Sequence, residues 1–218
     1  MTQIKIIDSQ PKTNRKLSIR GENRTKDVVE EAMKFGQLYF DGDRRFGYGG
    51  YRYDGRWKKV AKRICKLYKL QRNSKVLDVG CAKGFLVKDL RDLGINCFGI
   101  DISSYAIDNC HPDVKNYLLV GDVRNLPYPN SEFDLVLSIN TIHNLVRNDV
   151  IKALQELKRV SKKNCFVQID SYLTEDQKRK FEEWVLTAKY HDFPQGWQKL
   201  FLEADYSGDW DWTIFAET

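Results

Sequence analysis

The sequence predicts an α/β fold: a three-layer sandwich on a mostly parallel, doubly wound sheet of six or seven strands, with a helical extension at the N-terminus. Short, nearly continuous apolar runs are typical of strands buried on both faces of a parallel sheet. Segments with apolar residues at helical spacing alternate with these runs. The 218 residues suit one such domain, residues 56–218, preceded by an extension, residues 1–55.

The segments before the first strand are predicted to be helical. One helix is expected at about residues 26–40 and a second at residues 56–70, where Val60, Ala61 and Ile64 share an apolar face. The opposite face of the second helix is basic, because nine lysines and arginines, and no acidic residue, lie from Arg56 to Lys75. A solvated face is one interpretation, and attraction of an anionic substrate or nucleic acid is the other.

Strands are predicted at the apolar runs that follow. They cover residues 76–80, 96–101, 116–120, 133–139 and 164–170, with helices between them, which implies right-handed crossovers. Residues 175–190 and 195–204 are expected to be helical, and residues 210–217 form a last strand. A seventh strand is either very short, near Tyr206, or absent. Ligands of such sheets bind at the carboxyl ends of the strands.

A loop of small residues joins the first strand to the next helix, in the sequence Asp78-Val79-Gly80-Cys81-Ala82-Lys83-Gly84-Phe85. Gly80 and Gly84 let the backbone turn sharply and present amide groups at the positive end of the following helix, which suits the polar end of a nucleotide-like cofactor. A dinucleotide fingerprint requires glycine at positions 80, 82 and 85, and Ala82 and Phe85 occupy the last two. The loop therefore favours another cofactor class.

The spacing of Asp78, Gly80 and Gly84 resembles motif I of the class I S-adenosylmethionine-dependent methyltransferases, with Ala82 in place of the middle glycine. Further matches follow in the family's order: a strand ending in Asp101, then Gly121-Asp122 with Leu126-Pro127, then Phe133-Asp134-Leu135-Val136. The resemblance covers about residues 75–171. It implies S-adenosyl-L-methionine as the cofactor, S-adenosyl-L-homocysteine as the product and methyl transfer as the activity.

The resemblance also implies how the cofactor is held. Residues 80–84 would hold the methionine portion, Asp101 the ribose hydroxyls and Asp122 the adenine amino group, while the backbone of Val123 reads the edge of the ring. The predicted cofactor-binding residues are Asp78, Gly80, Cys81, Ala82, Gly84, Asp101, Ile102, Asp122, Val123 and Asn140. Taken singly, each acid also fits a solvated loop carboxylate or a helix cap, but together and in order they favour the cofactor site.

Two residues after the fourth strand are candidates for the methyl-transfer step. Transfer from a sulfonium is an in-line displacement, so the protein chiefly aligns the acceptor and excludes water, and a hydroxyl acceptor benefits from a general base. His143 is the base candidate, although its neighbours Ile142 and Leu145 equally fit a packing role. Asn140 is expected to bound the sulfonium and the acceptor. It is not followed by the Pro-Pro-Tyr or Pro-Pro-Phe of adenine amino-methyltransferases.

An aromatic, glycine-rich segment, residues 46–57, is predicted to form a lid. Its candidate contacts are Tyr48, Tyr51, Arg52 and Tyr53, with rings to pack on a ligand and an arginine to meet an anion. The alternative is a turn whose aromatic side chains cover the edge of the core. His191, in the later segment 184–197, is a second base candidate on the opposite wall.

Composition argues against several other classes. No run approaches the roughly 18 apolar residues that a membrane span needs, and the N-terminus lacks a secretory apolar region, so a soluble, cytoplasmic protein is expected. The five cysteines include no Cys-x-x-Cys pair and the three histidines lie far apart, so we expect reduced thiols and no metal site. A monomer or homodimer without a membrane partner is expected.

These inferences lead to a prediction of function. We expect an S-adenosylmethionine-dependent methyltransferase that acts on a small polar or anionic metabolite, with sugar- and nucleotide-linked compounds as candidates and oxygen favoured over nitrogen. RNA methylation is one alternative, supported by the basic helix and opposed by the lack of an appended RNA-binding module. A non-catalytic cofactor-binding module is the other, supported by Ala82.

Overall fold

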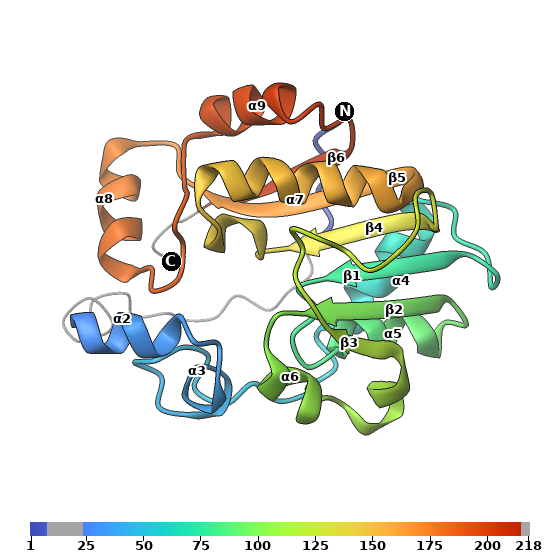
Figure 1. The fold of residues 1–218 in the computed structure, drawn as a ribbon, viewed down its shortest axis with the longest axis horizontal. Helices are drawn as coiled ribbons and strands as arrows, with labels where there is room; N and C mark the ends of the chain where they lie inside the picture. The colour runs from blue at the N-terminus through green and yellow to red at the C-terminus, as the bar shows by residue number, and fades with distance from the viewer. Residues whose placement is uncertain (8–23, 215–218) are drawn as a thin grey trace.

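The computed structural model describes residues 1–7 and 24–214. Within them, six strands form one sheet with helices on both faces (Figure 1). The strands are β1 (Lys75–Val79), β2 (Asn96–Asp101), β3 (Leu118–Val120), β4 (Phe133–Ile139), β5 (Ser161–Ser171) and β6 (Asp209–Ile214). Their order across the sheet is β3-β2-β1-β4-β5-β6, and every neighbouring pair is parallel. The predicted fold class is thereby confirmed.

Helices cover the sheet on two sides. The α-helices of the described residues are α2 (Lys26–Ala32), α3 (Gln37–Asp41), α4 (Trp57–Leu67), α5 (Phe85–Asp92), α6 (Ser104–Asp108), α7 (Arg147–Val160), α8 (Glu175–Trp184) and α9 (Pro194–Glu203), with 3-10 turns η1 (Pro112–Tyr117) and η2 (Ile142–Asn144). Ile64 of α4 and Leu90 of α5 share an apolar cluster with Leu137 of β4. On the other face, Leu154 of α7 and Phe201 of α9 share a cluster with Val136. None of the described helices has the length and apolar character needed to cross a membrane.

The first residues of the chain join the edge of the sheet. Gln3 pairs in parallel with Trp210 of β6, and the amide of Ile4 donates to the Trp210 carbonyl oxygen (2.9 Å). Ile6 is fully buried in the cluster of α4 and α5. The beginning of the extension therefore packs on the sheet, while residues 24–56 lie elsewhere, beside the carboxyl ends of the strands (Figure 1).

The prediction of a single helix at residues 26–40 is wrong, because two helices form there. α2 ends at Ala32, Phe35 adopts a left-handed φ of 48°, and α3 begins after Gly36. The Phe35 carbonyl oxygen accepts a hydrogen bond from the Ser103 hydroxyl (2.5 Å). A tertiary contact thus takes an acceptor that a continuous helix would have used internally.

The C-terminal part also differs from the prediction. The helix expected at residues 175–190 ends at Trp184, and the amides of Lys189 and Tyr190 donate instead to the carbonyl oxygen of His143. Tyr206 is buried and belongs to no strand, so the described residues hold six strands and no seventh. The end of the strand expected at residues 210–217 lies outside the described residues.

Candidate functional site

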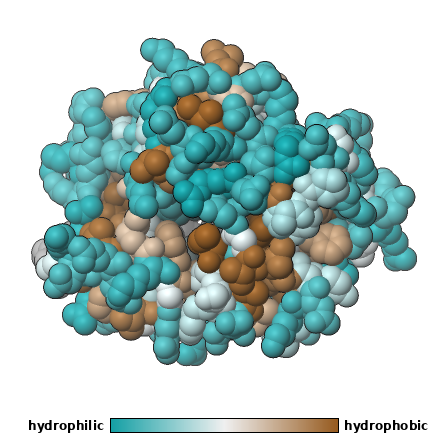
Figure 2. Space-filling model, viewed as in Figure 1, coloured by the Kyte–Doolittle hydropathy of each residue, from teal (hydrophilic) through white to brown (hydrophobic). Residues whose placement is uncertain are grey.

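A cavity of about 1330 Å³ lies where β1, β2, β3 and β4 end. The chain leaves β1 toward β2 and leaves β4 toward β5, in opposite directions across the sheet, which makes this the switch point where such sheets bind ligands. Residues 33–57, Trp184 and Lys189 supply the rest of the wall. Pockets for small ligands usually measure roughly 300–1,000 Å³, so this cavity is large for a single small ligand. The face seen in Figure 2 is mostly hydrophilic, with apolar side chains gathered near its centre.

The loop after β1 is shaped by close packing. Gly80 has a φ of 81°, and a Cβ placed on it would lie 2.0 Å from Oγ1 of Thr141, so only glycine fits there. Gly84 has a φ of 73° and precedes α5, although it does not itself line the cavity. Ala82 also adopts a positive φ, 49°. Gly80, Cys81 and Ala82 line the cavity, and their backbone lies close to any ligand there.

Asp101 ends β2 beside this loop. Its Oδ2 accepts a hydrogen bond from the Ala82 amide (2.7 Å) and its Oδ1 one from the Ser103 amide (2.8 Å). Burial raises the pKa of Asp101. Asp78 in β1 is buried too, and burial, together with the charge of Asp101, raises its pKa to about 7. The floor of the cavity therefore carries two carboxyl groups that form no ion pair within the described residues.

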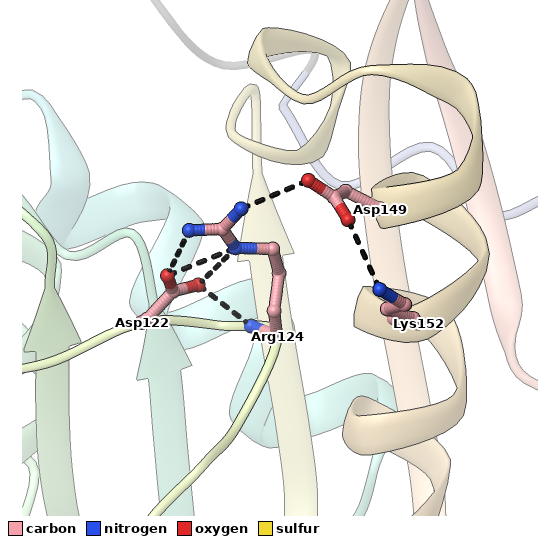
Figure 3. Close-up of polar contacts among 4 residues, drawn as sticks. All are labelled: Asp122, Arg124, Asp149 and Lys152. Carbon is pink, nitrogen blue, oxygen red and sulfur yellow. Dashed lines mark hydrogen bonds and ion pairs between the residues drawn. The ribbon is translucent and has the colours of Figure 1, made fainter.

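Asp122, Arg124 and Asp149 form a bridge at another part of the wall (Figure 3). The Arg124 guanidinium donates to both oxygens of Asp122 and, through Nη1, to Oδ2 of Asp149 (2.9 Å). These bonds lower the pKa values of both aspartates, with the side-chain bond from Arg124 as the largest cause. The bridge joins the loop after β3 to the first turn of α7.

The predicted lid segment, residues 46–57, and the preceding helix α3 contact the segments that follow β1 and β2. The Tyr51 ring stacks on Phe85 of α5, with centroids 4.9 Å apart. Asp41 of α3 accepts hydrogen bonds from Lys83 (2.5 Å) and from the Tyr105 hydroxyl (2.7 Å). Tyr48, Tyr51 and Arg52 line the cavity, as the residues of a lid would.

Besides Gly84, three predicted residues lie outside the cavity lining. The Tyr53 hydroxyl donates to Asp89 (2.5 Å). His191 bonds the Tyr172 hydroxyl (3.0 Å). His143 is 5% exposed and its Nε2 lies 3.7 Å from Asp170, while burial lowers the pKa of the imidazole. The turn η2 carries His143 inward from the end of β4, so neither histidine faces the cavity in this structure.

Asn140 does line the cavity, together with Ile102 and Val123. It has a φ of 52°, and its Oδ1 accepts a hydrogen bond from the Thr213 hydroxyl (3.1 Å). Left-handed backbone at a non-glycine residue often marks a functional position. The Thr213 contact shows that the end of β6 helps to position this side chain.

Charged side chains of both signs line the cavity. Its lining includes seven basic residues, Lys34, Arg44, Arg45, Arg52, Arg56, Arg124 and Lys189, and five aspartates, Asp43, Asp78, Asp101, Asp122 and Asp149. Most of the basic residues have partners: Lys34 pairs with Glu31, Arg45 with Asp43, Arg56 with Asp54 and Arg124 with two aspartates, and Arg44 donates to carbonyl oxygens. Among described residues, the side chains of Arg52 and Lys189 form no ion pair or hydrogen bond.

Sequence reasoning missed Asp149 as a cavity residue, although Asp149 follows the fourth strand and stands in the first turn of the next helix. Segment 184–197 was expected on the opposite wall, and Trp184 and Lys189 of this segment do line the cavity. The sequence did not single out these two residues, because their positions depend on how α8 and the following segment pack.

Comparisons with known proteins bear on this site. Residues 77–169 match a family described as "Methyltransferase domain". The chain is 37% identical over 142 residues to the tRNA (carboxymethyluridine(34)-5-O)-methyltransferase of Arabidopsis thaliana, which covers 62% of this chain and 33% of that protein. It is 29% identical over 109 residues to the mitochondrial arginine-hydroxylase NDUFAF5 of Rattus norvegicus, over 48% of this chain and 31% of that protein. The chain thus spans about a third of the length of these two relatives.

A solved structure shows the same fold. A chain in the complex between the Trm112 methyltransferase activator and a methyltransferase of Haloferax volcanii superposes with a TM-score of 0.53 at 23% identity. The match covers 69% of this chain and 72% of that chain.

Proposed function

Because this chain belongs to the class I S-adenosylmethionine-dependent methyltransferases, we propose that it transfers a methyl group from S-adenosyl-L-methionine to an oxygen of a small polar or anionic acceptor. Sugar- and nucleotide-linked metabolites are the acceptor candidates. The observation that supports this proposal is the set of cavity side chains that form no ion pair within the described residues, the carboxyl groups of Asp78 and Asp101 and the cations of Arg52 and Lys189.

The carboxyl groups of Asp78 and Asp101 suit the cofactor. S-adenosyl-L-methionine supplies a methyl group on a cationic sulfonium and also carries an ammonium group, and both cations favour nearby carboxylates. Because Gly80 has no side chain, the backbone at this position is open to the methionine portion. A Cβ there would collide with Thr141. Asp101 would accept from the ribose hydroxyls, while Asp122 and the backbone of Val123 would meet the adenine. Residues 80–84 before α5 would bind the carboxylate end.

The cations of Arg52 and Lys189 suit an anionic acceptor. Arg52 and Lys189 come from segments far apart in the sequence, yet both line the cavity that the cofactor would enter. Each would gain a charge-assisted bond from a carboxylate or phosphate of the acceptor. Asn140, held by Thr213, would bound the space between the two ligands.

The chemistry places limits on the reacting atom. Among described residues no histidine lines the cavity, since His143 and His191 are packed behind its wall. An acceptor oxygen that is already ionised at neutral pH, such as a carboxylate, needs alignment and exclusion of water rather than a general base. The placement of His143 and His191 outside the lining therefore favours an acceptor with an ionised oxygen. The role of His143 as a general base stays a prediction, to be tested directly.

We also propose that residues 1–55 extend a methyltransferase domain of residues 56–218, with residues 24–55 acting as the lid. The contacts of Asp41 with Lys83 and Tyr105, and of Tyr51 with Phe85, support this division. They fix the segment to the loops after β1 and β2, where closure would exclude water from the reacting groups.

RNA is a second candidate acceptor, favoured by α4. Lys59, Lys62 and Lys66 are exposed on this helix and form no ion pair within the described residues, as is also true of Lys69 and Arg72 beyond it. On α8, by contrast, Lys178, Arg179 and Lys180 all pair with acids of the same helix. The similarity to a tRNA methyltransferase agrees with an RNA-binding face.

Gel-shift assays with a structured RNA at several salt concentrations separate the two acceptors. If RNA binds, replacing Lys59, Lys62 and Lys66 by alanine should reduce the number of counterions released on binding by about three, as measured from the salt dependence of the affinity. Replacing Lys178, Arg179 and Lys180 by alanine should change this number little. No binding at low salt would exclude the RNA alternative. Methylation of an anionic metabolite that is inhibited by the product S-adenosyl-L-homocysteine would exclude a non-catalytic binding module.

A further inference from the structure

We propose that Gln168 and Thr213 fix the side-chain amide of Asn140 with its N–H groups toward the cavity. This orientation selects an ionised oxygen, rather than an amino group, as the reacting part of the acceptor. Gln168 and Thr213 do not line the cavity, so they are positioning residues that act through Asn140. The inference rests on the proposed function, because it concerns the acceptor that shares the cavity with the cofactor.

Asn140 lies where the loops after β1 and β4 meet. Its side chain is exposed and lines the cavity, and the next residue, Thr141, packs against Gly80. The backbone amide of Asn140 donates to the carbonyl oxygen of Gln168 (2.8 Å), one residue beyond the end of β4. The strand β5 therefore holds the backbone from which the Asn140 side chain reaches the cavity.

Three side chains form a chain of hydrogen bonds that leads from the sheet to the cavity. Nε2 of Gln168 donates to Oγ1 of Thr213 (3.1 Å), and the Thr213 hydroxyl donates to Oδ1 of Asn140 (3.1 Å). A hydroxyl has one proton to donate, and here that proton goes to Asn140. Oδ1 of Asn140 is thereby occupied, while Nδ2 forms no hydrogen bond within the described residues and stays available to a ligand.

The buried end sets the direction of this chain. Gln168 is 4% exposed, and its Oε1 has no hydrogen-bond partner among the described residues. Turning the Gln168 amide over would place its NH₂ group in that unpartnered position, and a buried donor without a partner is tolerated less well than a carbonyl oxygen without one. Turning over the Asn140 amide alone would aim two donors at Oγ1 of Thr213 and leave the hydroxyl proton with no acceptor in the chain.

An N–H donor at Asn140 discriminates between two kinds of reacting atom. An ionised oxygen offers only lone pairs, so it accepts from Nδ2 in a charge-assisted hydrogen bond. An amino group that reacts must keep its lone pair free, and its own N–H groups would then face the N–H groups of Asn140. No histidine lies among the described lining residues, which agrees with this selection because an ionised oxygen needs no general base.

The test uses two probes of nearly the same shape, para-nitrophenol and para-nitroaniline, on the full chain saturated with S-adenosyl-L-homocysteine. Absorbance distinguishes the phenolate from the phenol, so the pKa of the bound probe measures the preference of the site for an ionised oxygen. In the wild type this pKa should fall by about one unit, which equals a preference of about 10-fold for the phenolate. Para-nitroaniline should bind at least about 10-fold more weakly than the phenolate.

Thr213→Val removes the hydroxyl and nearly keeps the shape of the side chain, so the freed Asn140 amide can turn either end to the cavity. The fall in the pKa of the probe should shrink to less than half, and para-nitroaniline should bind at least as tightly as to the wild type. Thr213→Ser keeps the hydroxyl and should behave like the wild type. Gln168→Met, which keeps the length and loses the donor, should behave like Thr213→Val.

Equal pKa values of the bound probe in Thr213→Val and Thr213→Ser would overturn the inference. So would weaker binding of both probes to Thr213→Val, which is the signature of a merely structural role, or failure of the wild type to bind the phenolate. Failure of the wild type to bind S-adenosyl-L-homocysteine would instead refute the proposed function, so the two failures are distinguishable.

Discussion

Gly80 and Thr141 pack so closely that a Cβ on the glycine would lie 2.0 Å from the threonine hydroxyl oxygen. The loop after β1 and the loop after β4 therefore fit together across the switch point of the sheet, and the positive φ of Gly80 adds a second reason for glycine at this position. The pair determines how close the backbone comes to a ligand in the cavity.

Gly80→Ala should destabilise the protein by roughly 2–4 kcal/mol, because the methyl group overlaps Thr141 and the backbone conformation becomes strained. Denaturant unfolding measures the free energy, and calorimetry should show a parallel loss of S-adenosyl-L-homocysteine binding. Adding Thr141→Gly should restore part of the stability by removing the overlap and leaving the strain. A double variant no more stable than Gly80→Ala would contradict the packing argument.

His143→Ala should chiefly affect stability. The side chain is 5% exposed and lies behind the cavity wall, so its removal leaves a small cavity and costs roughly 1–3 kcal/mol. Turnover at saturating substrate should fall less than 10-fold. A loss of 10²- to 10⁴-fold with unchanged cofactor affinity is the signature of a general base and would return His143 to the reaction.

Asp78 should make the stability of the protein depend on pH. Burial raises its pKa from 3.8 to about 7, so the folded protein holds a proton that the unfolded chain has released. Its contribution to stability is therefore full below the unfolded pKa and is lost as pH rises through the folded value.

A cationic cofactor should favour the ionised form of Asp78 and expel that proton. The affinity for S-adenosyl-L-homocysteine, which keeps the ammonium group, should rise as pH increases toward about 7 and then level off. Calorimetry at pH 6 in two buffers of different ionisation enthalpy should detect proton release, and Asp78→Asn should abolish it. Proton uptake, or release that persists in the variant, would argue against contact between Asp78 and the cation.

Arg52→Ala and Lys189→Ala should impair use of the acceptor and spare the cofactor. For an anionic acceptor, each variant should raise KM about 10-fold, since a charge-assisted bond is lost at a partly solvated site. The affinity for S-adenosyl-L-homocysteine should stay within twofold. Arg179→Ala on α8, outside the cavity, serves as the control, and equal kinetics in all three variants would remove Arg52 and Lys189 from the acceptor site.

The sequence predicted the parts of the site that follow from strand order. Asp78, Gly80, Asp101 and Asp122 stand at or just beyond ends of parallel strands, and such ends meet at one edge of the sheet. Periodicity does not set where a side chain in a turn points, which is why His143 was a reasonable base candidate although η2 buries it. Segment 184–197 was expected on the opposite wall, but periodicity could not single out Lys189, whose position depends on tertiary hydrogen bonds to the His143 carbonyl.

The strands were predictable for a similar reason, since continuous apolar runs such as Leu135 to Leu137 signal burial on both faces. The break at Phe35 was not, because it depends on a hydrogen bond from Ser103, distant in the sequence. Contacts of this kind arise only once the fold has formed.

The cofactor site should be tested first by calorimetric titration with S-adenosyl-L-homocysteine and, separately, NADH, on the wild type and on a folded Asp101→Ala variant. We expect micromolar binding of S-adenosyl-L-homocysteine, at least about 10-fold weaker in the variant because the ribose hydroxyls lose a charged acceptor, and no binding of NADH. Binding of NADH alone, of neither compound, or of S-adenosyl-L-homocysteine with equal strength to both proteins would contradict this expectation.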